Sequence, residues 1–305
     1  MDRKENEEVE GVMSAEQQAS FDAEQASSAR YAKYVLFVLI IVYIFNFIDR
    51  QILSILAEEI KADLGIGDAE IGFLYGTAFA IFYAVFGIPL GRLADMWNRK
   101  KLISMGLSFW SLMTAMSGFA QNFGSLAFCR FGVGVGEASA TPAAFSMLSD
   151  YFSPKVRASV LAIYSSGIYL GSGIGLFLGG AIVHTWHGWY PDPTLAPLGI
   201  KAWQAAFLAV GIPGILMAFW VWTLREPVKG ASEGILTPAH PAPFKAAGSS
   251  LMSVLPGLSI VSLYVAGGVR AVVVNLFVAV IIGLIFYGLY VLMPTLLQWI
   301  ALGIG

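Results

Sequence analysis

The sequence GRLADMWNRKK, residues 91–101, joins two apolar segments of residues 71–90 and 102–119. Each segment is close to the length of a membrane-spanning helix, which needs about 20 mostly apolar residues. The connection holds one acid, Asp95, among the cations Arg92, Arg99, Lys100 and Lys101. Basic residues gather in cytoplasmic loops of membrane proteins, so this stretch predicts a cytoplasmic connection between two spans.

Four more segments bring the predicted spans to six: about residues 34–56, 123–148, 158–183 and 203–224. The chain is 57% hydrophobic and 12% charged, whereas a soluble domain carries about 25% charged residues. No strand pattern separates the spans, and lipid permits only helices or closed barrels. The sequence therefore predicts an all-α integral membrane protein, with residues 34–224 forming a six-helix bundle.

The segments outside the bundle predict three further regions. Residues 1–33 begin with a polar stretch rich in Glu, Gln, Ala and Ser, so we expect a disordered cytoplasmic tail, with a weak amphipathic helix as the alternative. Residues 225–250 hold four prolines and predict a cytoplasmic linker. Residues 251–268, interrupted by a Pro-Gly pair, predict an interfacial or re-entrant segment. Residues 269–305 predict a seventh span and a truncated further one, so we expect a fragment of a longer chain.

The basic residues of alternate loops predict the orientation. Lys155, Arg157, Arg225 and Lys229 lie on the side of residues 91–101, as do two cations before the first span, whereas the opposite side has only two. We therefore expect a multi-pass protein with a cytoplasmic N-terminus, in the plasma (inner) membrane.

Composition also excludes several functions. A net charge of -2 argues against nucleic-acid binding, because no basic stripe exists to contact phosphates. Cys129 is the only cysteine, which excludes a disulfide framework or a cysteine-based metal site. His184 and His187 have a spacing that could bind a metal, but no third ligand is evident, so we expect interfacial residues and no metal. No catalytic constellation is present, and the sequence does not predict an enzyme.

Four charges lie inside predicted spans. They are Asp49 and Arg50 in the first span, and Arg130 and Glu137 in the fourth. Each costs about 2.5–3.5 kcal/mol on insertion scales, so such residues normally face an aqueous cavity or a partner. We predict that they form a proton-coupling or substrate site. The alternative is a static salt bridge that joins helices.

Helix geometry predicts which of these charges pair. Neighbouring helix residues point about 100° apart, so Asp49 and Arg50 are not each other's main partner. We expect Arg50 to pair with Glu137 across the bundle, while Asp49 faces the cavity or Arg130.

The fourth and fifth spans are rich in glycine. The sequence between Arg130 and Glu137 is FGVGVG, and no strand precedes it, so we exclude a nucleotide-binding loop. Small residues at helical spacing let membrane helices approach closely. The glycines predicted to pack helices are Gly134, Gly136, Gly171, Gly175 and Gly179.

The motifs together resemble a known family. Residues 91–101 resemble the signature loop of the major facilitator superfamily, with departures at Met96 and Asn98. The resemblance implies a gating loop in which Gly91 allows close helix approach and Asp95 accepts hydrogen bonds from a helix N-terminus or from Arg99, with Lys100 in the same basic cluster. Residues 45–51 and 131–138 resemble the spinster branch, and the match covers about residues 34–227. The last glycines of the fifth span resemble a motif associated with antiporters, but Leu176 replaces its proline, which weakens a claim of antiport.

This resemblance implies a function. It suggests two pseudo-symmetric six-helix halves, the C-terminal one absent from this chain, and transport by alternating access. It also implies a monomeric carrier in membrane lipid when complete, with an amphiphilic or lipid-like substrate, the proton as coupling ion and no other cofactor. Two alternatives stay open: a carrier of organic anions anchored by Arg50 and Arg130, and a non-transporting scaffold or receptor.

Overall fold

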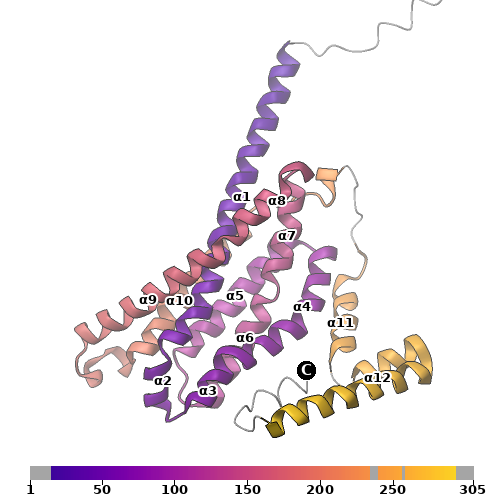
Figure 1. Cartoon of the computed structure of the whole chain (residues 1–305). Helices are drawn as coiled ribbons and strands as arrows, with labels where there is room; N and C mark the ends of the chain where they lie inside the picture. Colours follow the sequence, from indigo (N-terminus) through magenta and orange to yellow (C-terminus); the bar gives the residue numbers. More distant parts are fainter. Residues whose placement is uncertain (1–14, 234–239, 256–257, 293–305) are drawn as a thin grey trace, which may run out of the picture.

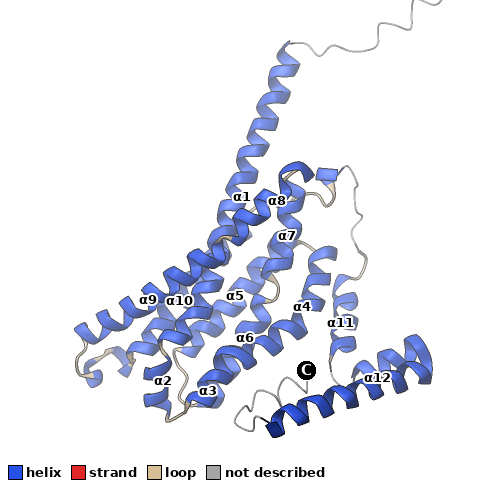
Figure 2. Cartoon of the chain, in the orientation of Figure 1, coloured by secondary structure: helices blue, strands red, loops and turns tan. Residues whose placement is uncertain are grey.

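The computed structural model describes residues 15–233, 240–255 and 258–292 of the chain. Within these ranges it consists of helices and loops, and no strand is present (Figure 2). The first span is the end of α1 (Ala15–Ile55), which is followed by the short α2 (Ala57–Leu64). The second is a continuous run made of α3 (Asp68–Gly72), the π-helical turn η1 (Phe73–Thr77) and α4 (Ala78–Met96).

The remaining spans follow the predicted order. They are α5 (Arg99–Ser117), α6 (Phe123–Glu137), α7 (Ala140–Tyr151), α8 (Pro154–Ser165), α9 (Gly167–Trp189) and α10 (Ala202–Trp222). Between α9 and α10 lie the short 3-10 turns η2 (Pro193–Leu195) and η3 (Pro197–Gly199). Ala138 and Ser139 divide the fourth predicted span into α6 and α7, and Ser166 separates α8 from α9 within the fifth.

Among the residues that the structure describes, five helical runs are long and apolar enough to cross a membrane. They are Ser28–Ile55, Asp68–Met96, Pro154–Trp189, Ala202–Trp222 and Gly267–Gly288. The third and fourth predicted spans, α5 and α6 with α7, lie inside the same bundle (Figure 1). α5 begins with three basic residues, and the fourth span is interrupted, so neither forms one long uncharged helix.

The loops gather at two ends of the bundle (Figure 1). The basic end holds the α4–α5 and α7–α8 connections and the segment that follows α10. The opposite end holds α2, the α5–α6 connection and the turns between α9 and α10.

The buried apolar side chains form two clusters. One lies toward the basic end and includes Val42, Leu107, Trp110 and Met217. The other lies toward the opposite end and includes Ile52, Leu126, Trp203 and Phe207. Along α1, α6 and α10 the first cluster gives way to the second near mid-helix, so a layer between them is left for other side chains.

The predicted disordered tail is wrong for its second part. α1 begins at Ala15, so residues 15–33 are helical, as in the alternative prediction, and the first turns of α1 extend beyond the bundle (Figure 1). Its later turns already pack on the bundle, where Ala32 is buried. Ala, Glu and Gln are strong helix formers, and a helix already nucleated in the first span propagates into them at little cost. Residues 1–14 lie outside the described ranges.

After α10 the chain crosses the basic end and packs back on α4. The turn η4 (Ala231–Glu233) is followed by α11 (Pro243–Val254), which lies along α4 and buries Ala247 and Ser250. α12 (Leu258–Leu292) then runs past the bundle, with a kink at Gly268, where φ is 65°. This positive φ requires glycine, and it marks the boundary that the sequence predicts between the 251–268 segment and the seventh span. Residues 293–305, where we expect a truncated further span, lie outside the described ranges.

Candidate functional site

Asp49 and Arg130 meet in the layer between the two apolar clusters. The Arg130 Nη1 donates to Asp49 Oδ1 at 3.1 Å, and both side chains are almost fully buried. The hydroxyl of Thr114 on α5 donates to the other carboxylate oxygen, Oδ2. Three helices, α1, α5 and α6, therefore share one buried carboxylate.

Arg50 and Glu137 form the second pair of this layer. Arg50 Nε donates to Glu137 Oε2 at 2.8 Å. The guanidinium carbon of Arg50 lies over three aromatic rings, at 5.0 Å from the ring centre of Phe47, 4.5 Å from Phe79 and 5.0 Å from Tyr83. An arginine over aromatic faces is stabilised by cation–π attraction, so this cation has two kinds of partner.

The two pairs cross between α1 and α6. Consecutive residues of α1 bind Arg130 and Glu137, which lie two turns apart on α6. The expected partners of Arg50 and Asp49 are therefore found in the structure. The four formal charges cancel, which limits the cost of placing them in an apolar bundle.

Some polar atoms of this layer have no partner among the described residues. They are Glu137 Oε1, Arg130 Nε and, one turn before Asp49, Asn46 Oδ1. A buried polar atom without a hydrogen bond costs about 1–3 kcal/mol, and such atoms concentrate at functional sites. The layer therefore retains capacity to bind a further donor or acceptor.

Glycines bring the helices of the site together, as predicted. A Cβ at Gly136 would lie 2.8 Å from Trp110 Cβ on α5, and one at Gly134 would lie 2.7 Å from Phe79 O on α4. Gly171, Gly175 and Gly179 line α9 where it packs on α1, and a Cβ at each would lie 3.0 Å or less from an α1 atom. Side chains at these positions would push α6 away from α4 and α5, and α9 away from α1.

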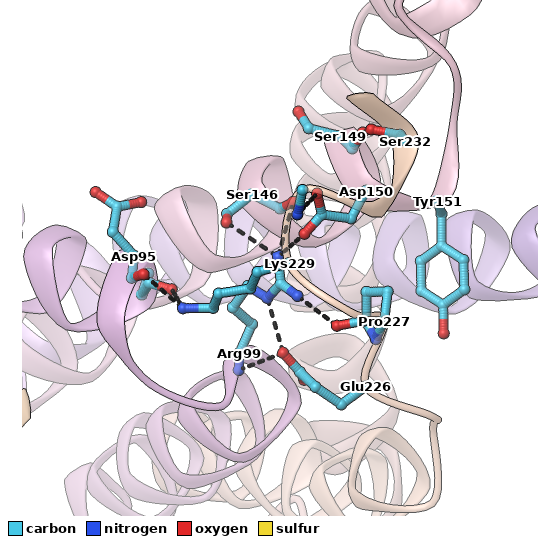
Figure 3. A network of polar contacts seen from close by, with 12 residues as sticks. Asp95, Arg99, Ser146, Ser149, Asp150, Tyr151, Glu226, Pro227, Lys229 and Ser232 are labelled. Carbon is cyan, nitrogen blue, oxygen red and sulfur yellow. Dashed lines mark hydrogen bonds and ion pairs between the residues drawn. The ribbon is translucent and has the colours of Figure 1, made fainter. Parts of the chain in front are cut away.

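A second polar network closes the basic end (Figure 3). Arg99, at 1% exposure, pairs with Asp150 of α7 and donates from Nε to Glu226 Oε1 at 2.7 Å. Its Nη2 donates to the carbonyl of Pro227 at 2.7 Å. The other Glu226 oxygen accepts the backbone N–H of Lys100 at 2.9 Å. This buried arginine joins the α4–α5 loop to α7 and to the segment after α10.

Two predictions for the gating loop are wrong. Arg99 does not bind Asp95, because Asp150 and Glu226 surround its guanidinium; the exposed Asp95 carboxylate has no hydrogen bond or ion pair within the described ranges. Gly91 does not allow an unusually close approach, since a Cβ there would lie at an ordinary 3.8 Å from Pro142 Cβ. Asn98, at a position where the resemblance favours glycine, caps α5 by accepting the Lys101 N–H at 2.9 Å.

Lys229 contacts the Asp95 backbone instead. Its ammonium donates to the carbonyls of Ala94, at 3.2 Å, and Asp95. Partial burial, and then the nearby Arg99 guanidinium, hold the pKa of Lys229 below its usual value. The segment after α10 thus covers the end of α4 with Lys229, whose charged form is destabilised at this position.

Sequence reasoning missed four residues of these sites: Thr114, Asp150, Glu226 and Lys229. Asp150 and Glu226 each follow an apolar span directly, where an acid near a basic loop could have suggested a partner for Arg99. Thr114 sits in an otherwise ordinary span and gave no signal. His187 binds Glu59 at 2.8 Å, and no group of three potential metal ligands occurs among the described residues.

Comparison with known proteins places this geometry in a family. Residues 39–303 match the family model described as Major Facilitator Superfamily. An MFS-type efflux pump of Mycolicibacterium smegmatis is 35% identical over 58% of this chain and 38% of its own length. Protein spinster of Drosophila melanogaster is 30% identical over 63% of this chain and 29% of its own length. A probable L-galactonate transporter of Escherichia coli is 28% identical over 60% of this chain and 37% of its own length.

A solved structure is similar in both sequence and fold. The crystal structure of a bacterial homologue of the human lysosomal transporter spinster, inward-facing and occupied, matches with a TM-score of 0.61 and 38% identity. The match covers 67% of this chain and 46% of that one. The chain thus spans less than half the length of each of these relatives. It is a spinster-like member of the Major Facilitator Superfamily.

Proposed function

We propose that this chain forms one six-helix half of a proton-coupled secondary transporter that moves amphiphilic or lipid-like molecules by alternating access. The observation that carries the proposal is the pair of crossed ion pairs, Asp49 with Arg130 and Arg50 with Glu137, buried between α1 and α6. A scaffold has no need of four charges in its membrane core, where ionisable residues usually mark proton or substrate pathways.

The two carboxylates are suited to proton coupling. An arginine stays charged at all physiological pH values, so only Asp49 and Glu137 can gain a proton here. A protonated Glu137 carries no charge and releases Arg50, which is the one member of the four with a partly exposed side chain, at 26%. The released Arg50 keeps its three aromatic rings as partners. Proton uptake would thereby change the contact between α1 and α6, which is the kind of step that alternating access requires.

The aromatic side chains around Arg50 support an amphiphilic substrate. Phe47, Phe79 and Tyr83 place apolar surface next to a charged group, which suits a molecule with a polar head and an apolar tail. The resemblance to the spinster branch implies the same substrate class.

An organic anion is the second candidate substrate. The similarity to the L-galactonate transporter favours it, and Arg50 or Arg130 would anchor a carboxylate. Each arginine is already paired with an acid, so anion binding would first require release of Asp49 or Glu137. The observed pairing therefore favours the amphiphile.

Uptake into proteoliposomes tests the proposal. The transporter that contains this chain is reconstituted, and a fluorescent lysophospholipid and radiolabelled galactonate are offered with and without an inward proton gradient. Gradient-stimulated lysophospholipid uptake supports the proposal, and stimulated galactonate uptake alone supports the second candidate. A wider panel of amphiphiles and anions is then offered. If the proton gradient changes the uptake of none of them, proton coupling is overturned.

We also propose the orientation expected from sequence, with the N-terminus in the cytoplasm of a plasma-membrane protein. The only native cysteine, Cys129, is buried, so single cysteines introduced at the two ends can be labelled selectively. An impermeant thiol reagent applied to intact cells should label a cysteine at exposed Leu198, at the opposite end, and spare one at exposed Lys155. The reverse labelling would overturn the orientation.

A further inference from the structure

Two cavities adjoin at the opposite end of the bundle and share Trp186. The first, of about 300 Å³, lies where α2 meets the end of α9 and the start of α10. The second, of about 320 Å³, lies between α9 and α10. The Trp186 ring nitrogen donates to the carbonyl of Ile200 at 3.1 Å, so this shared wall is held in place.

The first cavity is lined by charges of both signs. Glu59 and Asp63 come from α2, whereas His187 and Lys201 come from the α9–α10 side. His187 Nε2 lies 2.8 Å from Glu59 Oε1, and the Lys201 ammonium pairs with Asp63, which also accepts the Trp203 ring N–H at 2.9 Å. Lys201 and His187 remain about half exposed, at 48% and 55%. An ammonium has three donors, and the pair with Asp63 uses one of them.

The second cavity is apolar. Ala205 and Ala209 on α10 face Ala181 and Ile182 on α9, so small side chains leave a groove along the two helices. Trp189 closes one side, and Thr185 is the only hydroxyl residue of the lining. A charged cavity and an apolar groove thus meet where both helices end, at the level where Trp and Tyr concentrate in membrane proteins.

We propose that these two cavities form a binding site for one membrane phospholipid with a primary-ammonium headgroup, phosphoethanolamine. One acyl chain lies in the groove between α9 and α10, and the headgroup lies in the charged cavity. The phosphate accepts from Lys201, and the ammonium donates to Glu59. The site is separate from the charge layer between α1 and α6, and the proposal does not depend on transport.

Charge favours this headgroup over others. The formal charges of Glu59, Asp63 and Lys201 sum to one excess negative charge in the cavity. A headgroup with only a phosphate would be repelled by this excess, whereas a zwitterion brings a cation to match it. A quaternary ammonium has no N–H to donate, so it would lose the hydrogen bond to the carboxylate that a primary ammonium forms.

Native mass spectrometry of the full chain in detergent tests this site. The chain is mixed with equimolar phosphatidylethanolamine, phosphatidylglycerol and phosphatidylcholine that have the same acyl chains, and the retained lipids are counted. We expect one phosphatidylethanolamine to be retained preferentially. Lys201→Ala should weaken its retention about tenfold, the size expected for loss of one charge-assisted hydrogen bond.

A second variant keeps the test independent of folding defects at Lys201. Ala209 is exposed in the groove, so Ala209→Leu fills the space without disturbing the core and should displace the acyl chain. The matched controls are Ala162→Leu, on the exposed face of α8, and Lys155→Ala, at the basic end, which should retain the lipid as the wild type does.

The outcomes separate the possible occupants. Equal retention of all three lipids, or loss of lipid in both Ala→Leu variants, indicates general coating of the apolar surface and overturns the site. Preference for phosphatidylglycerol, abolished by Lys201→Ala, overturns the zwitterionic headgroup. Free phosphoethanolamine is also added as a competitor for the headgroup cavity. If it displaces the lipid but Ala209→Leu does not, the groove has no role in binding and that part of the proposal is overturned.

Discussion

The Nη1 atom of Arg130 lies 3.1 Å from Oδ1 of Asp49, and the two side chains are only 1% and 2% exposed. This pair joins α6 to α1 in the layer between the two apolar clusters. A buried ion pair is weak evidence for stability by itself, because both charges lose their hydration. Its partners are nevertheless interdependent, since removing one leaves the other charged and unpaired.

We predict that Arg130→Met destabilises the chain by about 3–5 kcal/mol, because among the described residues it leaves the buried Asp49 carboxylate with only the Thr114 hydroxyl as hydrogen-bond partner. Unfolding of the detergent-solubilised protein, followed by circular dichroism, gives the difference. In the double variant Arg130→Met with Asp49→Asn, no uncompensated charge remains, and most of the stability should return. A double variant as unstable as Arg130→Met alone would contradict this interpretation of the pair.

The cytoplasmic loop motif gives a second prediction. Arg99 is buried and binds Asp150, Glu226 and Pro227, so Arg99→Ala leaves two acids without their shared cation. We expect a loss of about 3–5 kcal/mol in the free energy of unfolding.

Asp95→Asn is the matched comparison for Arg99→Ala. Its carboxylate is exposed, so we expect a change within about 0.5 kcal/mol. In a complete transporter Asp95→Asn is expected to shift the balance of inward- and outward-facing forms, measured by distances between spin labels on the two halves. If Asp95→Asn destabilises this chain as much as Arg99→Ala does, the assignment of the network to Arg99 is wrong.

The bundle was predictable from sequence because each span is a stretch of about 20 mostly apolar residues. The pairing of Arg50 with Glu137 was also predictable, since consecutive helix residues point in different directions and only two opposite charges lay at a matching depth. The close approach at Gly136 and Gly171 followed from glycines at helical spacing.

Other features were not predictable because they depend on contacts distant in sequence. Arg99 meets Asp150 and Glu226, which lie 51 and 127 positions away, and no local pattern selects them over Asp95, four residues away. Thr114 is one of several hydroxyl residues in α5, and only the arrangement of α5 relative to α1 shows that it reaches Asp49. For the start of α1, polar composition favours a disordered tail, and only the alternative prediction was a helix; continuity with the apolar span that follows decides between them.

Lys229 gives a prediction for the dependence of stability on pH. Its pKa is lowered by partial burial and by Arg99, so the unfolded chain binds this proton more tightly than the folded chain does. Stability therefore rises with pH through the interval below the ordinary lysine value of about 10.4, and levels off above it. Unfolding of wild type and Lys229→Gln between neutral pH and about pH 10.4 should show their difference moving in favour of the wild type as pH rises. Lys155→Gln, at an exposed site, serves as control, and a difference that is constant with pH would contradict the effect of burial.

Amide variants of Asp49 and Glu137 test the proposed coupling site, because an amide has nearly the shape of the carboxylate but does not take up a proton. The amide oxygen of Asp49→Asn can still accept from Arg130 Nη1 while its NH2 donates to the Thr114 hydroxyl, and Glu137→Gln can still accept from Arg50 Nε. Each arginine keeps a hydrogen-bond acceptor, so both variants should fold, although with lower stability than the wild type. Neither amide can gain a proton at physiological pH, so the step that releases Arg130 or Arg50 is lost. We expect each variant to abolish transport driven by a pH gradient in proteoliposomes of the complete transporter, while exchange of substrate without a gradient continues. Glu70→Gln, at an exposed acid of the opposite end, controls for the general loss of a carboxylate and should leave the gradient response intact. If both variants transport with the pH dependence of the wild type, the charges of this layer serve to hold α1 and α6 together, and the proton is bound elsewhere.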